Sequence, residues 1–447
     1  MASFGGGKVG GAGAGSNGEA AGESSGSTPV LSFFRRVKDA VVRPVPGLVK
    51  GVINTGSSSA AAAPSSSAAR SAGTVRVSTS TERGKATKAS AGKVSAGSGS
   101  KASSTSSGPT SAADRKPYHT AQFDQLMEAE NIDMDQLRKL SWNGIPPEMR
   151  PFVWQIMLGY LPTNKNRREQ AVERKRKEYV DSIPLYFDKT PDEADIADRT
   201  TQEGELLRQI LVDLPRTSPN LPFFQQEPIQ KMMERILYIW SIRHPASGYV
   251  QGMNDLLTPL LLVAMQPYAA DRGNALRCDV ATIPASSLAE VEADAYWTLT
   301  KLLDNIQDHY TFSQPGLQRM VLRLEDLMRR HSPALDTHFQ DEGVQYMQFA
   351  FRWMNCLLLR ELPLRAVLRL WDTYLAEERA GFENFHVYVC AVFLKEHEER
   401  LMSMQFQDIL MFLQELPTGG WGEEEIEPIL SQAFILSTLY SDSSTFS

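Results

Sequence analysis

Two polar side chains, Arg216 and Gln251, could act on another molecule. Arg216 ends the sequence Ile-Leu-Val-Asp-Leu-Pro-Arg, which starts at residue 210. Because Pro215 disfavours a helical conformation at the residue before it, we expect a helix to end here and to leave Arg216 on a stiff, extended loop. Asp213, three residues earlier, could orient the guanidinium by charge-assisted hydrogen bonds, and the planar fork of donors suits an oxyanion. An arginine on a loop, taken alone, is most often a solvated surface charge.

Gln251 lies in the sequence Ser-Gly-Tyr-Val-Gln-Gly-Met-Asn-Asp, which starts at residue 247. The flanking glycines Gly248 and Gly252 carry no side chain, so the backbone can come close to another molecule. A carboxamide can donate one hydrogen bond and accept another at the same time. Asn254 or Asp255 can cap the apolar helix that follows, and we assign Asp255 mainly to capping. Considered alone, Gln251 would most often be a satisfied polar group in a turn.

A third segment, 142–154, reads Trp-Asn-Gly-Ile-Pro-Pro-Glu-Met-Arg-Pro-Phe-Val-Trp. The glycine and the two prolines predict a tight entry into a helix. We interpret Trp142 and Trp154 as aromatic anchors of the core. Arg150 is expected to bond inside the domain rather than to a ligand.

The elements that must position these segments are predicted to be helices. Apolar residues recur at the spacing of a buried helical face, as in Met233, Ile236, Leu237 and Trp240. Asp133 and Gln136 resemble a capping box at the start of another helix. No convincing run of alternating strand residues is visible. The sequence therefore predicts an all-α fold, with a single large multi-helix domain over 117–447 and an inserted loop at about 266–293.

Residues 1–116 are predicted to be a disordered, basic tail. The stretches 1–30 and about 54–115 are rich in Gly, Ser, Ala and Thr and have too few apolar residues to offset the entropy of ordering. Between them, 31–43 combines Phe and Val at helical spacing with several Arg and Lys residues. This segment either anchors the chain to an anionic membrane or a partner groove, or it stays disordered.

Charge and motif content exclude several classes of function. Residues 1–116 hold 15 basic and five acidic residues, which leaves 31 basic and 48 acidic residues in 117–447. An acidic body argues against nucleic-acid binding. The three cysteines form no C-x-x-C pair, and the seven histidines form no H-E-x-x-H pattern, so no metal site is predicted. The sequence also lacks a phosphate-binding G-x-x-x-x-G-K-[ST] loop and an apolar stretch long enough to span a membrane. We expect a cytoplasmic protein whose membrane contacts are peripheral.

Together the three segments resemble the TBC domain, the catalytic unit of most Rab GTPase-activating proteins. The patterns W-x-G-I-P…R-x-x-V-W, I-x-x-D-x-x-R and Y-x-Q-G-M occur here complete and in that order. The resemblance extends over about 135–440, nearly the whole predicted domain. Stretches 305–310 and 358–364 are similar to the branch of the family that contains the TBC domain family member 22 proteins.

The resemblance implies a GTPase-activating protein for a Rab-family small GTPase, with no autonomous reaction and no cofactor of its own. GTP and Mg²⁺ would be carried by the partner, and Golgi traffic is suggested. Arg216 matches the family's arginine finger and Gln251 its glutamine finger. The supporting residues would be Asp213, Tyr249, Gly252, Asn254 and, inside the domain, Arg150. Asp213 would either hold Arg216 or have a purely structural role.

Two alternatives to catalysis stay open at this point. The first is a non-catalytic helical scaffold that binds a GTPase or a trafficking factor. The second is an unrelated helical protein with accidental motif matches. A scaffold has no chemical need for both fingers, so their presence favours catalysis.

Overall fold

The computed structural model describes residues 112–188, 202–269, 272–377 and 380–441. These residues all belong to one compact unit, Ser111–Ser447. The predicted disordered tail, 1–116, lies outside the described residues as far as residue 111, and so does the predicted anchor at 31–43. The predicted boundary at 117 is too late, because residues 112–116 already belong to helix α2 (Ala112–Glu128).

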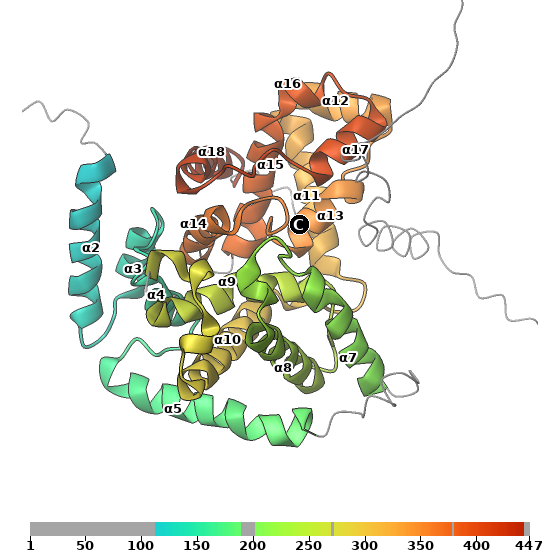
Figure 1. Cartoon of the computed structure of the whole chain (residues 1–447). Coiled ribbons are helices and arrows are strands. Elements are labelled where there is room, and N and C mark those ends of the chain that lie inside the picture. Colours follow the sequence, from blue (N-terminus) through green and yellow to red (C-terminus); the bar gives the residue numbers. More distant parts are fainter. Residues whose placement is uncertain (1–111, 189–201, 270–271, 378–379, 442–447) are drawn as a thin grey trace, which may run out of the picture. The chain divides into compact units, whose positions relative to one another are not determined.

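The described chain is built from helices, which confirms the all-α prediction (Figure 1). Its α-helices are α2 (Ala112–Glu128), α3 (Met134–Ser141), α4 (Arg150–Met157), α5 (Lys165–Ser182), α7 (Gln202–Asp213), α8 (Glu227–Arg243), α9 (Met253–Met265), α10 (Ala285–Asn305), α11 (Pro315–His331), α12 (Pro333–Glu342), α13 (Met347–Asn355), α14 (Leu364–Ala376), α15 (His386–Glu396), α16 (Glu398–Leu401), α17 (Phe406–Gln414) and α18 (Glu423–Ser441). Shorter 3₁₀ and π-helical segments are η1 (Ile183–Phe187), η2 (Leu214–Arg216), η3 (Pro222–Gln225), η4 (Gln266–Tyr268), η5 (Arg272–Arg277), η6 (Val280–Thr282), η7 (Gln307–His309) and η9 (Gly381–Phe385). Within the described ranges, the β-type pairing is confined to an isolated antiparallel bridge between Asn131 and Asn164.

Two local predictions can be checked against these bounds. Asp133 is the N-cap of α3, and its carboxylate accepts hydrogen bonds from the backbone N–H groups of Asp135 (2.9 Å) and Gln136 (3.2 Å). The loop predicted at 266–293 is too long, because α10 already begins at Ala285. The segment between α9 and α10 is also less irregular than expected, since η4, η5 and η6 occupy most of its described part.

The helices pack in two neighbouring groups within this unit. In the first group α10 lies against α5, α8 and α9, and in the second α15 lies against α11 and α18 (Figure 1). Helix α14 joins the groups, because it contacts α3, α4 and α9 as well as α18. The predicted apolar face of α8 is buried at all four of its positions. None of the described helices combines the length and the apolar character that a bilayer crossing requires.

A buried carboxylate on α14 holds the segment 145–154 in place. Asp372 is fully buried and accepts hydrogen bonds from Arg150 Nη2 (2.9 Å) and Trp154 Nε1 (2.7 Å). The backbone N–H of Ile145 donates to the same carboxylate at 3.0 Å. Trp154 also stacks on Trp371, with ring centroids 6.0 Å apart. The prediction that Arg150 bonds inside the domain is therefore confirmed.

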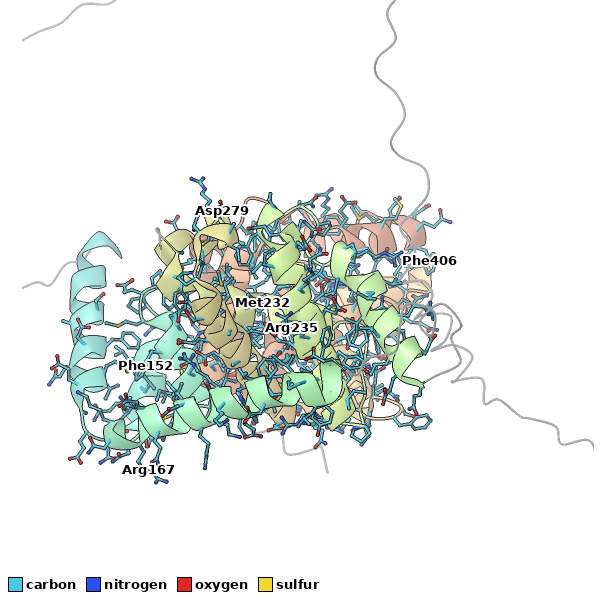
Figure 2. The ribbon with its side chains drawn as sticks, turned by 60° about the horizontal axis from the view of Figure 1, so that its bottom comes forward. Phe152, Arg167, Met232, Arg235, Asp279 and Phe406 are labelled. Carbon is cyan, nitrogen blue, oxygen red and sulfur yellow. The ribbon has the colours of Figure 1, made fainter. Side chains whose placement is uncertain are left out.

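Replacing Arg150 with methionine should destabilise the protein by about 3–5 kcal/mol, because the change leaves the Asp372 carboxylate buried without its counter-charge. Urea unfolding of the variant and of the wild type measures this difference. Arg167→Met is the matched control, since Arg167 is exposed and points outward from α5 (Figure 2). Equal stability losses at the two positions would contradict the interpretation of Asp372 as a structural centre.

Candidate functional site

Arg216 is the last residue of η2, a single 3₁₀ turn that continues directly from α7. The predicted extended exit at Leu214 is wrong: the chain stays helical through Arg216 and becomes extended only at Thr217, which has φ −75° and ψ 116°. Pro215 lies near the start of this turn, where its fixed φ is compatible with the geometry and its missing N–H is not needed. Arg216 still lies on a short rigid turn, as the sequence indicated.

The Arg216 side chain is exposed, and within the described residues its guanidinium has no hydrogen bond or ion pair. The expectation that Asp213 orients it is therefore wrong. The Asp213 carboxylate instead accepts a hydrogen bond from the Tyr249 hydroxyl at 2.8 Å. Helix α7 directs Asp213 into the protein, whereas the turn that follows directs Arg216 outward.

Tyr249 links the Arg216 turn to the Gln251 loop. Its buried hydroxyl, which donates to Asp213, also lies 3.1 Å from Asn254 Oδ1. Asn254 Nδ2 in turn donates to Thr217 Oγ1 at 2.9 Å, and Thr217 Oγ1 donates to the backbone carbonyl of Asp213 at 2.9 Å. These four side chains form a closed set of contacts, which we call the Tyr249 network. Because of it, the residues on either side of Arg216 and of Gln251 lie together.

The Tyr249 network is buried, and burial changes the acidity of its members. Desolvation raises the pKa of Asp213, while the hydrogen bond from Tyr249 acts in the opposite direction. Desolvation also raises the pKa of Tyr249, and the nearby Asp213 carboxylate raises it further. The phenol therefore stays protonated and remains the donor of this contact.

Gln251 lies on the loop between α8 and α9. The side chain is half-buried, and its carboxamide makes no hydrogen bond within the described residues. Gly252 has φ +109°, a left-handed value that favours glycine. The Gln251 carbonyl accepts a hydrogen bond from Asn355 Nδ2 at 3.0 Å, and the Gly252 N–H donates to Asn254 Oδ1 at 3.0 Å. The backbone of the loop is thus fixed, while the carboxamide is free to act.

Asp255 does not cap α9, which corrects the sequence assignment. Gly252 occupies the N-cap position, and no side chain accepts a capping hydrogen bond there. Asp255 instead forms an ion pair with Arg360, with Oδ2 and Nη2 2.8 Å apart. This pair ties the first turn of α9 to the connection between α13 and α14.

Sequence reasoning singled out Arg216 and Gln251 but missed three residues that contact their loops or the start of α9: Thr217, Asn355 and Arg360. Thr217 directly follows Arg216 and could have been included as a polar neighbour. No local signal marks Asn355 or Arg360, because each meets its partner across about a hundred positions of sequence.

One group of side chains in the described residues could in principle hold a metal ion. Asp308, the buried His309 and Glu383 place their ligand atoms within 4.8 Å of one another. Asp308, however, already forms an ion pair with Arg319, so a positive charge lies beside this group.

Comparison with known proteins identifies related sequences and a related fold. The model of the Rab-GTPase-TBC domain family matches residues 147–402. The chain is 47% identical over 329 residues to human TBC1 domain family member 22B, which covers 73% of this chain and 63% of that protein. It is 48% identical over 320 residues to GTPase-activating protein gyp1 of Schizosaccharomyces pombe, which covers 72% of this chain and 61% of that protein. The chain therefore spans less than two thirds of each relative.

A solved structure shows that the architecture is shared. The crystal structure of the Ypt/Rab-GAP domain of Gyp1p matches with a TM-score of 0.68 and 43% sequence identity. The match covers 72% of this chain and 99% of that domain.

Replacing Tyr249 with phenylalanine should lower the free energy of unfolding by about 1–3 kcal/mol, since Asp213 and Asn254 lose their shared donor while buried. Chemical denaturation measures the loss. Tyr388→Phe is the control, because Tyr388 is partly buried and its hydroxyl has no hydrogen bond in the described residues. A loss at Tyr249 no larger than at Tyr388 would show that the Tyr249 network does not stabilise the two loops.

Proposed function

Because the chain belongs to the Rab-GTPase-TBC domain family, we propose that it accelerates GTP hydrolysis by a Rab-family GTPase, with Arg216 and Gln251 supplied in trans. The observation that carries the proposal is that, in the part of the chain that the structure describes, the Arg216 and Gln251 side chains are unpaired and lie on neighbouring loops. Both are unpaired within the described residues, and both project from loops that the Tyr249 network holds together. The similarity to the Ypt/Rab-GAP domain of Gyp1p supports the choice of a Rab as partner.

Arg216 would stabilise charge in the transition state. Phosphoryl transfer from GTP spreads negative charge over the γ-phosphoryl oxygens and the leaving oxygen, and an arginine supplied in trans typically raises the rate by about 10³–10⁵. That range corresponds to roughly 4–7 kcal/mol of transition-state stabilisation. An exposed guanidinium with no partner among the described residues keeps its donors for such a contact. Lysine would be a poor substitute, because it lacks the planar fork.

Gln251 would position the attacking water. Its carboxamide can accept a hydrogen bond from the water and donate one to a phosphoryl oxygen at the same time. A glutamine is no useful base at neutral pH, so the contribution is orientation rather than proton removal. Asp213, Tyr249, Gly252 and Asn254 then act by fixing the two loops.

The nucleotide and Mg²⁺ belong to the partner in this proposal. The sequence contains no G-x-x-x-x-G-K-[ST] loop with which the chain itself could hold the phosphates. In this proposal the chain binds the GTPase and supplies the side chains of Arg216 and Gln251, and nothing else, to the reaction.

A turnover screen against GTP-loaded Rab proteins tests the proposal. At least one Rab should respond to the wild-type chain, Arg216→Ala should lower the stimulated rate about 10³-fold, and Gln251→Ala about 10²-fold or more. Arg167→Ala, on the outer face of α5, should leave the rate unchanged (Figure 2). A broad panel in which no Rab responds would favour the scaffold reading. An unimpaired Gln251 variant would mean that the partner's own glutamine orients the water.

We further propose that the chain works at endomembranes, including those of the Golgi, and that residues 1–116 direct it there. The support is the family's link to Rab proteins and the net charge of about +10 in this segment, counted from the sequence. Deleting residues 1–116 should leave turnover in solution unchanged and should alter the location of a fluorescently tagged chain in cells. Loss of activity in solution would show that this segment contributes to catalysis itself.

A further inference from the structure

The peptide group that follows Gln251 is held at both of its polar ends. Its carbonyl, which belongs to Gln251, accepts a hydrogen bond from Asn355 Nδ2 at 3.0 Å. Its N–H, which belongs to Gly252, donates to Asn254 Oδ1 at 3.0 Å. The two contacts come from different parts of the chain, since Asn254 lies in the first turn of α9 and Asn355 ends α13. Together they fix the plane of this peptide, and with it the direction in which the Gln251 side chain leaves the backbone.

Gly252 shows how closely Asn355 approaches this loop. A Cβ atom added at Gly252 would lie 2.4 Å from Asn355 Nδ2 and 3.4 Å from Cys356 Sγ. The sequence had suggested that this glycine allows another molecule to approach. The group that uses the space is instead the side chain of Asn355, from within the same domain.

Asn355 is itself held in place. Its side chain is buried, and its backbone carbonyl accepts a hydrogen bond from the Tyr310 hydroxyl at 3.0 Å. The chain then turns sharply through Leu357 and Leu358, whose φ values of 49° and 61° lie in the left-handed region. Such a conformation is unfavourable for a non-glycine residue and persists only where its surroundings impose it. Both leucine side chains are fully buried, and that packing holds the turn under the Gln251 loop.

A second contact fixes the same turn to α9. Arg360 forms an ion pair with Asp255, and the Cys356 thiol lies 3.7 Å from the same carboxylate oxygen. The start of α9 is therefore also joined to the segment that directly follows Asn355. This leaves Asn355 little freedom to move away from Gln251.

We propose that Asn355 is a positioning residue for Gln251: its side-chain amide fixes the peptide that aims the catalytic carboxamide at the partner's nucleotide. The inference rests on the proposed function, since it assigns Asn355 a part in the same reaction. Asn355 is expected to act on the rate at saturation rather than on docking. Misplacing a catalytic group by about 1 Å can cost on the order of 10²-fold in rate.

Asn355→Asp is the most informative variant. It keeps the size of the side chain but replaces the donor with a carboxylate oxygen facing the Gln251 carbonyl. With a Rab that responds to the wild type, kcat should fall about 10- to 100-fold while KM for the GTP-loaded Rab changes less than about threefold. Asn143→Asp, at an exposed asparagine with no side-chain hydrogen bond in the described residues, is the matched control and should leave both constants unchanged.

A double-mutant cycle separates positioning from a general effect on the fold. The Gln251→Ala variant keeps its backbone carbonyl but has no carboxamide to aim. If Asn355 acts through Gln251, adding Asn355→Asp to that variant should lower the residual rate by less than about twofold. A full, additive loss in the double variant would overturn the proposal, because Asn355 would then act through another group.

Hydrogen exchange measured by mass spectrometry tests the contact without the partner. Peptides covering residues 249–255 should exchange faster in Asn355→Asp than in the wild type, while peptides from α8 should be unchanged. If the Asn355→Asp variant shows unaltered exchange at 249–255 and full activity on the Rab, the inference about Asn355 is overturned, while the proposed function stands. A wild-type chain that stimulates no Rab would contradict the proposed function, and the inference with it.

Discussion

One buried hydroxyl joins the two parts of the proposed site. Tyr249 donates to Asp213 at the end of α7 and lies 3.1 Å from Asn254 at the start of α9, and Asn254 reaches across to Thr217. Buried polar groups that are left unpaired cost free energy, so such a set favours a single arrangement in which every contact is made. That arrangement brings together segments thirty-five positions apart in the chain and leaves Arg216 and Gln251 outside it. Their neighbours form hydrogen bonds inside the domain, whereas the Arg216 and Gln251 side chains make none with the residues that the structure describes.

Other buried contacts hold the helices that carry the Tyr249 network. Asp372 on α14 holds the segment around Arg150 and Trp154, and the same helix contacts α9, at whose start Asn254 lies. Asn355, at the end of α13, bonds the Gln251 carbonyl, and Arg360, after the strained turn, pairs with Asp255 in the first turn of α9. The helices are rigid and hold these contacts in place, and the short turns between them let the Arg216 and Gln251 side chains point away from the core. This is the arrangement expected where catalysis depends on orientation rather than on bond chemistry by the protein.

The sequence was informative about which helices form and which of their faces are buried, and less so about which side chains pair with each other. Apolar spacing predicted the buried face of α8, and the position of Arg150 beside two tryptophans predicted an internal role; both were confirmed. The pairing of Asp213 with Arg216 was wrong, since proximity in sequence does not reveal that α7 turns one side chain inward and the other outward. Asp255 was assigned to a local cap but bonds Arg360 across a hundred positions. Such contacts depend on how distant helices pack, which spacing within one segment cannot show.

The central claim is that both free side chains meet at one phosphoryl group of a partner. A crystal structure of the chain bound to a responsive Rab, loaded with GDP and a metal fluoride that mimics the transferred phosphoryl group, measures this directly. The account predicts that the Arg216 guanidinium and the Gln251 carboxamide both lie within about 3.2 Å of the mimic or of the water in line with it. A complex in which either side chain points away from the nucleotide, with the Rab's own glutamine on that water, would contradict it.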